Sequence, residues 1–120
     1  MVPSKKEQIE HLLKFSAYKL VEKYLPKQEW GGDSYKKIFT VKKHEILDYL
    51  RAKYILEELI DMTPSNDDGF YAIPLNSGFK IYEQERGFKF LERIVKTEDE
   101  VWENFVEYLI RYSGTGLDFT

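Results

Sequence analysis

The chain has 120 residues, a formal net charge of −3, 42% hydrophobic residues and 32% charged residues. This length and balance are typical of one globular domain and differ from those of disordered chains, which combine low hydrophobicity with high net charge. The chain contains no cysteine, which excludes disulfides, thiolate metal sites and cysteine nucleophiles within this sequence.

The composition also favours some partners over others. No apolar run approaches the roughly 18 residues of a membrane span or the core of a signal peptide, so we expect a cytoplasmic protein without membrane contact. The acidic balance disfavours nucleic acid as the main partner, because phosphate backbones attract positive charge. Aromatic residues make up 16% of the chain, so we expect some rings to lie on a surface that binds another protein.

The N-terminal quarter has the pattern of an amphipathic helix. Ser4 and Glu7 have the spacing of a capping box, and apolar residues from Ile9 to Leu25 recur at three- and four-residue steps. Pro26 lacks the backbone donor that a further turn needs. The sequence therefore predicts one helix of about five turns that ends before Pro26.

The next segment is rich in turn formers. Residues 26–39 are expected to form a loop, in which Tyr35 to Phe39 is a candidate short strand. A second helix is predicted from about Val41 to Asp61, with Thr40 as its candidate N-cap. Its wide apolar arc indicates burial on more than one side.

The second half of the chain changes to the pattern of a sheet. Three segments rich in aromatic and β-branched residues, separated by turn formers, predict a three-stranded antiparallel meander. The segments are Phe70 to Leu75, Phe79 to Gln84 and Phe88 to Val95. Pro74 cannot donate to a strand ladder, so its segment should be an edge strand or should bulge there.

A further helix should follow the sheet. Thr97 and Glu100 have capping-box spacing, and Ser113-Gly114 offers a C-terminal stop. Residues 115–120 are expected to form a flexible tail. The predicted fold class is α+β, with two N-terminal helices, a three-stranded antiparallel meander and a C-terminal helix in one compact domain over residues 1–120, the helices covering one face of the sheet.

No residue pattern predicts catalysis. His11 and His44 lie in separate predicted helices without a spaced third ligand, so we interpret them as ordinary surface histidines. The chain has neither a Gly-x-Ser-x-Gly turn nor a phosphate-binding loop. We therefore expect no enzymatic activity, no metal and no cofactor.

Basic side chains gather in one place. Lys36, Lys37, Lys42 and Lys43 alternate with Tyr35 and Phe39, the mixture that phosphate contacts and base stacking use. One alternative function is therefore a small nucleic-acid-binding module. The other interpretation, that these lysines keep an apolar segment soluble, is favoured by the net acidic charge.

The turn between the second and third predicted strands is the preferred contact site for a protein partner. Gly87 supplies the positive φ that such a turn needs and displays Arg86 at its tip. Arginine and tyrosine are favoured at interface hot spots, so Tyr82, Glu85 and Arg86 are the candidate partner-binding residues. If the face bearing Tyr82 is open, replacing Tyr82 or Arg86 by alanine should weaken binding without changing stability.

Three motifs in the second half of the chain carry a family resemblance. They are Asp68-Gly69-Phe70-Tyr71, Tyr82-Glu83-Gln84-Glu85-Arg86-Gly87, and Thr97-Glu98-Asp99-Glu100-Val101 before an aromatic amphipathic helix. Together they resemble a family of small immunity proteins from bacterial polymorphic toxin systems. The resemblance implies a cytosolic antidote that binds a cognate toxin domain, blocks its active site and has no chemistry of its own. It does not imply which residues touch the toxin.

Overall fold

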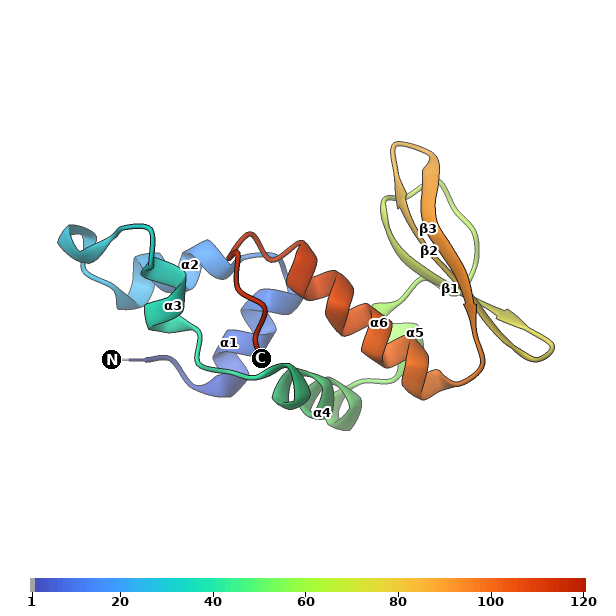
Figure 1. The fold of residues 1–120 in the computed structure, drawn as a ribbon, viewed down its shortest axis with the longest axis horizontal. Coiled ribbons are helices and arrows are strands. Elements are labelled where there is room, and N and C mark those ends of the chain that lie inside the picture. Colours follow the sequence, from blue (N-terminus) through green and yellow to red (C-terminus); the bar gives the residue numbers. More distant parts are fainter. Residues whose placement is uncertain (1) are drawn as a thin grey trace. The chain divides into compact units, whose positions relative to one another are not determined.

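The computed structural model describes residues 2–120 and confirms the α+β class (Figure 1). The helices are α1 Lys5–Leu13, α2 Ala17–Tyr24, α3 Ser34–Ile38, α4 Lys43–Lys53, α5 Leu56–Leu59 and α6 Glu98–Arg111, with a 3₁₀ turn η1 at Lys27–Glu29. The strands are β1 Gly69–Leu75, β2 Gly78–Glu85 and β3 Phe88–Val95. None of the helices within residues 2–120 has the length and apolar character that crossing a bilayer requires.

The prediction of one long N-terminal helix is wrong, because the helix is interrupted at Phe15 and the segment forms α1 and α2. Phe15 has φ of 54°, a left-handed conformation that ends α1. The N–H of Phe15 donates to Leu12 O at 3.2 Å and that of Ser16 to His11 O at 2.9 Å, the two bonds of a Schellman motif. The Phe15 ring meets the edge of Tyr108 at 5.9 Å between centroids. This ring contact helps to offset the cost of a non-glycine residue in that conformation.

The segment before α4 also differs from expectation. The stretch from Tyr35 to Phe39, a candidate strand in the sequence, is helical through Ile38 instead, because α3 occupies Ser34–Ile38. Thr40 does not cap α4; the Glu45 carboxylate accepts from Lys42 N–H at 2.9 Å, beside the first residue of the helix. The capping interaction is therefore shifted by two residues along the chain.

The second predicted helix is divided into α4 and α5. Ile55 is extended, with φ of −100° and ψ of 160°, and its N–H donates to the Glu58 carboxylate at 2.9 Å. This bond starts α5 afresh instead of continuing α4. The side chain of Ile55 is 61% exposed, so the break turns an apolar residue away from the core.

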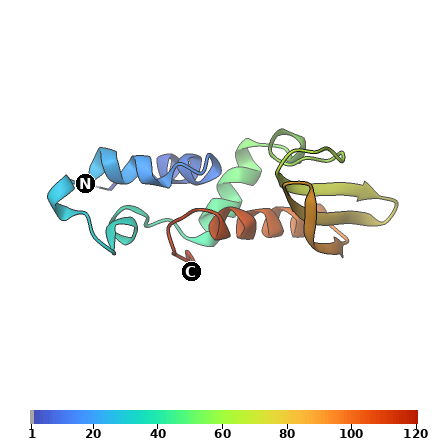
Figure 2. The ribbon, with the colours of Figure 1, turned by 90° about the horizontal axis from the view of Figure 1, so that it is seen from above.

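The predicted meander is confirmed. The strand order is β1-β2-β3 with both pairs antiparallel, and the strands lie side by side in Figure 2. Pro74 lies on β1, an edge strand, as its missing donor requires. On the outer side of β1, Asp61 forms a single parallel bridge to Tyr71. The register between β2 and β3 shifts between Ile81 and Glu83, where Leu91 has φ of 54°.

The sheet faces are covered by different segments. On one face, Phe70 packs against Phe105 of α6 at 5.6 Å between centroids, and Arg93 Nε donates to Asn104 Oδ1 at 2.9 Å. Of the helices expected to cover one face of the sheet, α6 contacts this face through Phe105 and Asn104. The loop before β1 covers part of the other face, where Gln84 Nε2 donates to Ser65 O at 2.9 Å.

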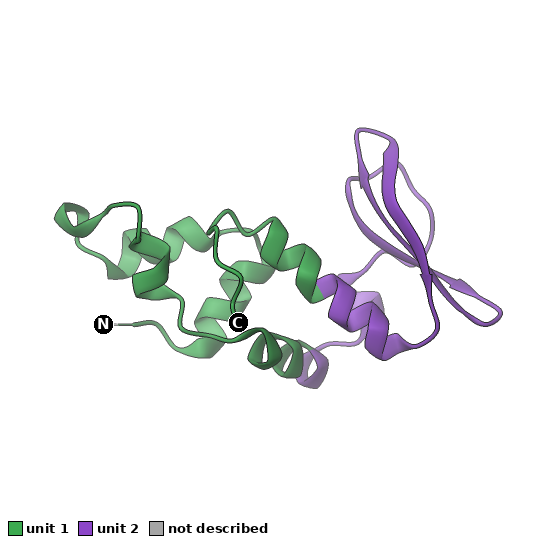
Figure 3. Cartoon of the chain, in the orientation of Figure 1, with its two compact units in different colours: residues 1–50, 106–120 green, residues 51–105 purple. Residues whose placement is uncertain are grey.

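The chain divides into two compact units, Met1–Leu50 with Val106–Thr120, and Arg51–Phe105 (Figure 3). The dividing lines fall close to the end of α4 and inside α6. The expectation of one domain over residues 1–120 stays a prediction.

The segment expected to be a flexible tail packs within the first unit. Phe119 is 5% exposed and meets Phe39 edge to face at 6.0 Å, and its carbonyl accepts from Lys43 N–H at 2.6 Å. Residues 115–120 thus contribute an aromatic side chain to the core of this unit.

Candidate functional site

The tip of the β2–β3 hairpin is built by two residues with positive φ. Arg86 has φ of 52° and Gly87 has φ of 83°, and Glu85 pairs with Phe88 across the turn. Successive left-handed residues are typical of the tight turns that match the twist of a hairpin. The N–H of Arg86 donates to Asp68 Oδ1 at 2.9 Å. Glu85 and Arg86 are both exposed, so the tip presents one negative and one positive side chain.

Tyr82, the third candidate contact residue, lies inside the protein. It is 1% exposed, its ring stacks on that of Tyr71, and Lys89 Nζ lies 4.9 Å from its ring centroid. The face that carries Tyr82 is therefore not open at this position, so the condition under which Tyr82 would contact a partner is not met. The loop before β1 and the neighbouring side chains on the same face account for this burial. Burial also raises the pKa of the Tyr82 phenol, with smaller contributions from Tyr71, Glu92 and Asp61.

The most exposed apolar side chains of the sheet lie on β3, and Leu75 of β1 is exposed to a smaller extent. Phe88 is 76% exposed, Leu91 54% and Ile94 68%. Within residues 2–120, β3 pairs with a strand on one side only, and that strand is β2. An end strand of this kind offers backbone donors and acceptors to an added strand. The predicted meander already makes this strand the end strand of the sheet, but the sequence could not show that these side chains are uncovered.

Three of the four lysines in the cluster, Lys37, Lys42 and Lys43, contact neighbouring acceptors, and Lys36 is exposed. Lys37 Nζ lies 3.6 Å from Asp33 Oδ1, and Lys42 Nζ donates to Thr120 O at 3.0 Å. Lys43 forms an ion pair with Glu107. These contacts offset part of the positive charge that a phosphate backbone would meet.

The two histidines occupy different settings. His11 Nδ1 lies 2.9 Å from Ser16 Oγ, at the junction of α1 and α2. His44 is exposed on α4. In the part of the chain that the structure describes, no group of three or more His, Asp or Glu side chains is placed to hold a metal ion.

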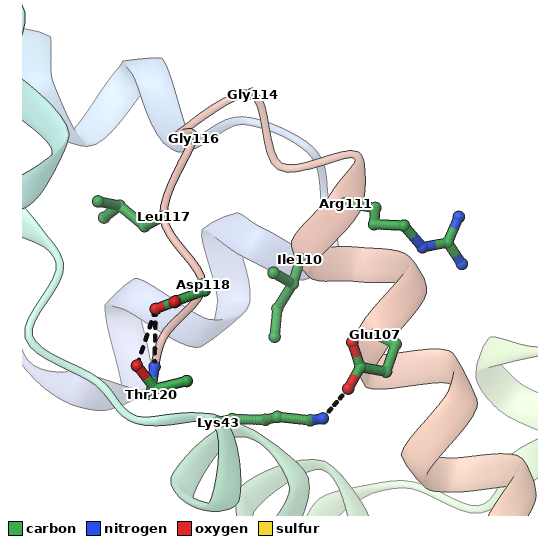
Figure 4. A pocket seen from close by; sticks show the side chains of 9 residues that line it. All are labelled: Lys43, Glu107, Ile110, Arg111, Gly114, Gly116, Leu117, Asp118 and Thr120. Atoms are coloured by element: carbon green, nitrogen blue, oxygen red, sulfur yellow. Dashed lines mark hydrogen bonds and ion pairs between the residues drawn. The ribbon is translucent and has the colours of Figure 1, made fainter.

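One cavity of about 500 Å³ lies beside the C-terminal loop of the first unit (Figure 4). Its charged groups interact with their neighbours: Lys43 and Glu107 point toward one another, and Asp118 accepts from the Thr120 hydroxyl at 2.9 Å. The Arg111 side chain points away from this loop in Figure 4. The two bonds from Thr120 hold the pKa of the Asp118 carboxyl below its usual value.

A second cavity, of about 460 Å³, was not predicted from the sequence. It is lined by Tyr18, Val21, Glu22, Trp30, Gly31, Ser34 and Tyr35. Tyr18 is 51% exposed and Trp30 is 44% exposed, which is unusual for such large rings. Tyr18 and Glu22 are one helical turn apart, so the i, i+4 spacing was the one local signal available. Their meeting with Trp30 and Tyr35 depends on the path of the loop.

Comparison with protein-family models, with curated proteins and with solved structures found no match to this chain.

Proposed function

We propose that this chain is a non-enzymatic protein-binding domain that accepts an extended strand of a partner protein along β3. The observation that carries the proposal is the exposure of Phe88, Leu91 and Ile94 on the end strand of the sheet. Added strands bind such edges through backbone hydrogen bonds, and alternate side chains supply specificity. Phe88 and Ile94 face opposite sides of the sheet, since their partners Glu85 and Lys80 are an odd number of residues apart on β2.

The proposed occupant is a different protein rather than a second copy. The register shift around Tyr82 and the left-handed Leu91 disturb the edge, and Lys89 places a charge on it. Bulges and lysines are the devices by which natural proteins limit pairing between identical edges. These features disfavour pairing of β3 with a second, identical β3. A different protein can supply a strand whose backbone and charges are complementary to this edge.

The family resemblance suggests the class of partner, a bacterial toxin domain that this chain would neutralise as an immunity protein. Under this proposal the exposed Glu85 and Arg86 at the hairpin tip form the polar rim beside the apolar contacts of β3. The net charge of −3 suits a basic toxin, including a nuclease, because acidic groups can occupy the place of phosphates.

The test is calorimetry of the whole chain with the product of the gene immediately upstream of its own. The proposal expects a complex with an affinity of micromolar or better. Phe88→Ser and Ile94→Ser should each weaken it about tenfold or more, because each removes a contact of the exposed edge. Arg86→Ala should weaken it less, as expected of a rim residue.

Ile55→Ser is the matched control, because Ile55 is 61% exposed but lies outside the sheet. All four variants should unfold within about 0.5 kcal/mol of the parent chain, since they change exposed side chains. Equal binding by the edge variants and the parent would refute the strand-addition surface. Dimers of the chain alone that dissociate on Ile94→Ser would show that the occupant is a second copy.

A further inference from the structure

We propose that the cavity between α2 and the loop leading to α3 binds an alkylated ammonium cation, held by the rings of Tyr18, Trp30 and Tyr35 with Glu22 as the counter-charge. The residues that line the cavity all belong to the first compact unit, whereas β3 belongs to the second. The inference therefore does not depend on the proposed protein-binding function.

Local structure places the first two groups. Tyr18 and Glu22 lie on α2 with i, i+4 spacing, so both side chains project from the same helix face. Lys23, the next residue along, is directed toward α1, where its Nζ donates to Glu7 Oε2 at 2.8 Å. The α2 side of the cavity thus offers an aromatic ring and a carboxylate.

The loop and the start of α3 place the other two rings, and hydrogen bonds hold the Trp30 ring and the turn before Tyr35. The Trp30 indole N–H donates to Leu25 O at 2.9 Å, which sets the orientation of the ring. Ser34 Oγ accepts from Gly31 N–H and donates to Gly31 O, both at 2.8 Å, closing the turn that leads into Tyr35. The site is therefore largely formed before any ligand arrives, which reduces the entropy cost of binding.

The chemistry of the lining selects a cation. The face of an aromatic ring carries partial negative charge, and several rings around one site attract a positive ligand, with tryptophan the strongest. Among the described residues, no lysine or arginine lines the cavity, so no cation of the chain itself occupies it. The carboxylate of Glu22 adds attraction for a cation and repels anions.

Alkylation of the ligand follows from the same arrangement. A bare ammonium group is strongly hydrated and loses that hydration among rings, whereas methyl groups contact ring faces and leave the charge spread over a larger surface. The shared ligand chemistry is a trimethylammonium head. It can come from a free small molecule or from the methylated lysine of a peptide, and the experiment separates these two sources.

The first measurement is a titration followed by the NMR signal of the Trp30 indole N–H. The probes are choline and 3,3-dimethyl-1-butanol, which have nearly the same shape but differ in charge. We expect choline to shift the signal with a dissociation constant of about 10 mM or lower, and the neutral alcohol to bind at least about fivefold more weakly. Equal shifts with both probes would show a simple apolar pocket and overturn the proposal.

The variants Tyr18→Leu and Glu22→Gln test the lining. Both residues lie on the exposed side of α2, and each change should weaken choline binding about threefold or more. The matched controls are Tyr112→Leu and Glu57→Gln, which replace an exposed tyrosine and an exposed glutamate outside the cavity. The controls should bind choline like the parent. Circular dichroism of each variant confirms that a loss of binding is not a loss of fold.

A second titration uses a short peptide containing trimethyl-lysine and the same peptide with unmodified lysine. Tighter binding of the methylated peptide than of choline supports a peptide source, and tighter binding of choline supports a free small molecule. Both results support the cation site. The absence of any saturable shift with choline and with the methylated peptide up to about 50 mM would overturn it.

Discussion

The ring of Tyr71 on β1 lies parallel to the ring of Tyr82 on β2, with 4.8 Å between centroids and 8° between the ring planes. The two hydroxyls have different surroundings. Tyr71 Oη donates to Asp67 O at 2.5 Å, whereas Tyr82 Oη is buried without a hydrogen-bond partner among the described residues. A buried hydroxyl without a partner costs free energy, so this pair stabilises the sheet through its rings and not through the second hydroxyl.

Replacing Tyr82 with phenylalanine should keep the stack and remove the unpartnered hydroxyl. We expect the free energy of unfolding at pH 7 to stay equal or to rise by up to about 1 kcal/mol. Tyr71→Phe is the control and should lose about 1 kcal/mol, because its hydroxyl is bonded. Urea unfolding measures the free energy of unfolding of both variants. A clear loss of stability in Tyr82→Phe would show that its hydroxyl has a partner after all.

The raised pKa of the Tyr82 phenol should make the stability of the fold depend on pH in the alkaline range. Burial raises the pKa of Tyr82 above its ordinary value of 10.0, so the unfolded chain releases this proton before the folded one does. The contribution of Tyr82 to stability is complete below pH 10 and is lost as pH rises toward the pKa in the folded state. The stability difference between Tyr82→Phe and the parent should therefore grow above pH 10. An unchanged difference between pH 9 and 11 would contradict the raised pKa.

Gly78 at the start of β2 should not tolerate a side chain. Its φ is 141°, and a Cβ atom there would lie 2.2 Å from the backbone carbonyl oxygen of Val95. Gly78→Ala must therefore separate the strands or strain the turn, and we expect a loss of at least about 2 kcal/mol in thermal unfolding. Gly32→Ala is the control, because a Cβ on Gly32 would meet nothing within 4 Å. Equal melting temperatures for the two variants would refute this account.

Gln8 joins α1 to the segment before α4. The side chain is fully buried; its Oε1 accepts from Thr40 N–H at 2.9 Å and Val41 N–H at 3.0 Å, and its Nε2 donates to Pro3 O at 2.9 Å. Gln8→Leu leaves these backbone groups without partners, so the free energy of unfolding should fall by about 2 to 4 kcal/mol. The control is Gln28→Leu at an exposed position, which should change the free energy of unfolding by no more than about 0.5 kcal/mol. Chemical denaturation of both variants decides the matter.

The carboxylate of Glu7 links α1 to α2, and the strength of this link depends on pH. Its carboxylate accepts from Lys23 Nζ at 2.8 Å and from Tyr24 Oη at 2.5 Å, and these bonds lower its pKa below the ordinary 4.5. A lowered pKa in the folded state stabilises the fold above pH 4.5, and this contribution is lost as pH falls through the folded value. Glu7→Gln should remove that part of the acid sensitivity, while Glu57→Gln should keep it. Thermal unfolding between pH 2 and 6 provides the comparison.

The sequence by itself determined the elements whose signals are local. Alternating apolar residues with glycine turns defined three strands, and the spacing of Thr97 and Glu100 located the start of α6, where Glu100 N–H donates to Thr97 Oγ1 at 3.2 Å. The same holds for Ser4 and Glu7 at the start of α1. These interactions join residues three positions apart, so a short window of sequence contains both partners.

Only the tertiary structure decided where the long helical patterns break and which rings are covered. Phe15 takes a left-handed conformation that no local rule assigns to phenylalanine, and its ring meets Tyr108 from a distant part of the chain. Strand alternation placed Tyr82 on the face opposite Ile81, but whether that face is open depends on the loop that folds over it. Hydrophobic periodicity is a property of neighbours in sequence, whereas burial depends on segments that meet only after folding.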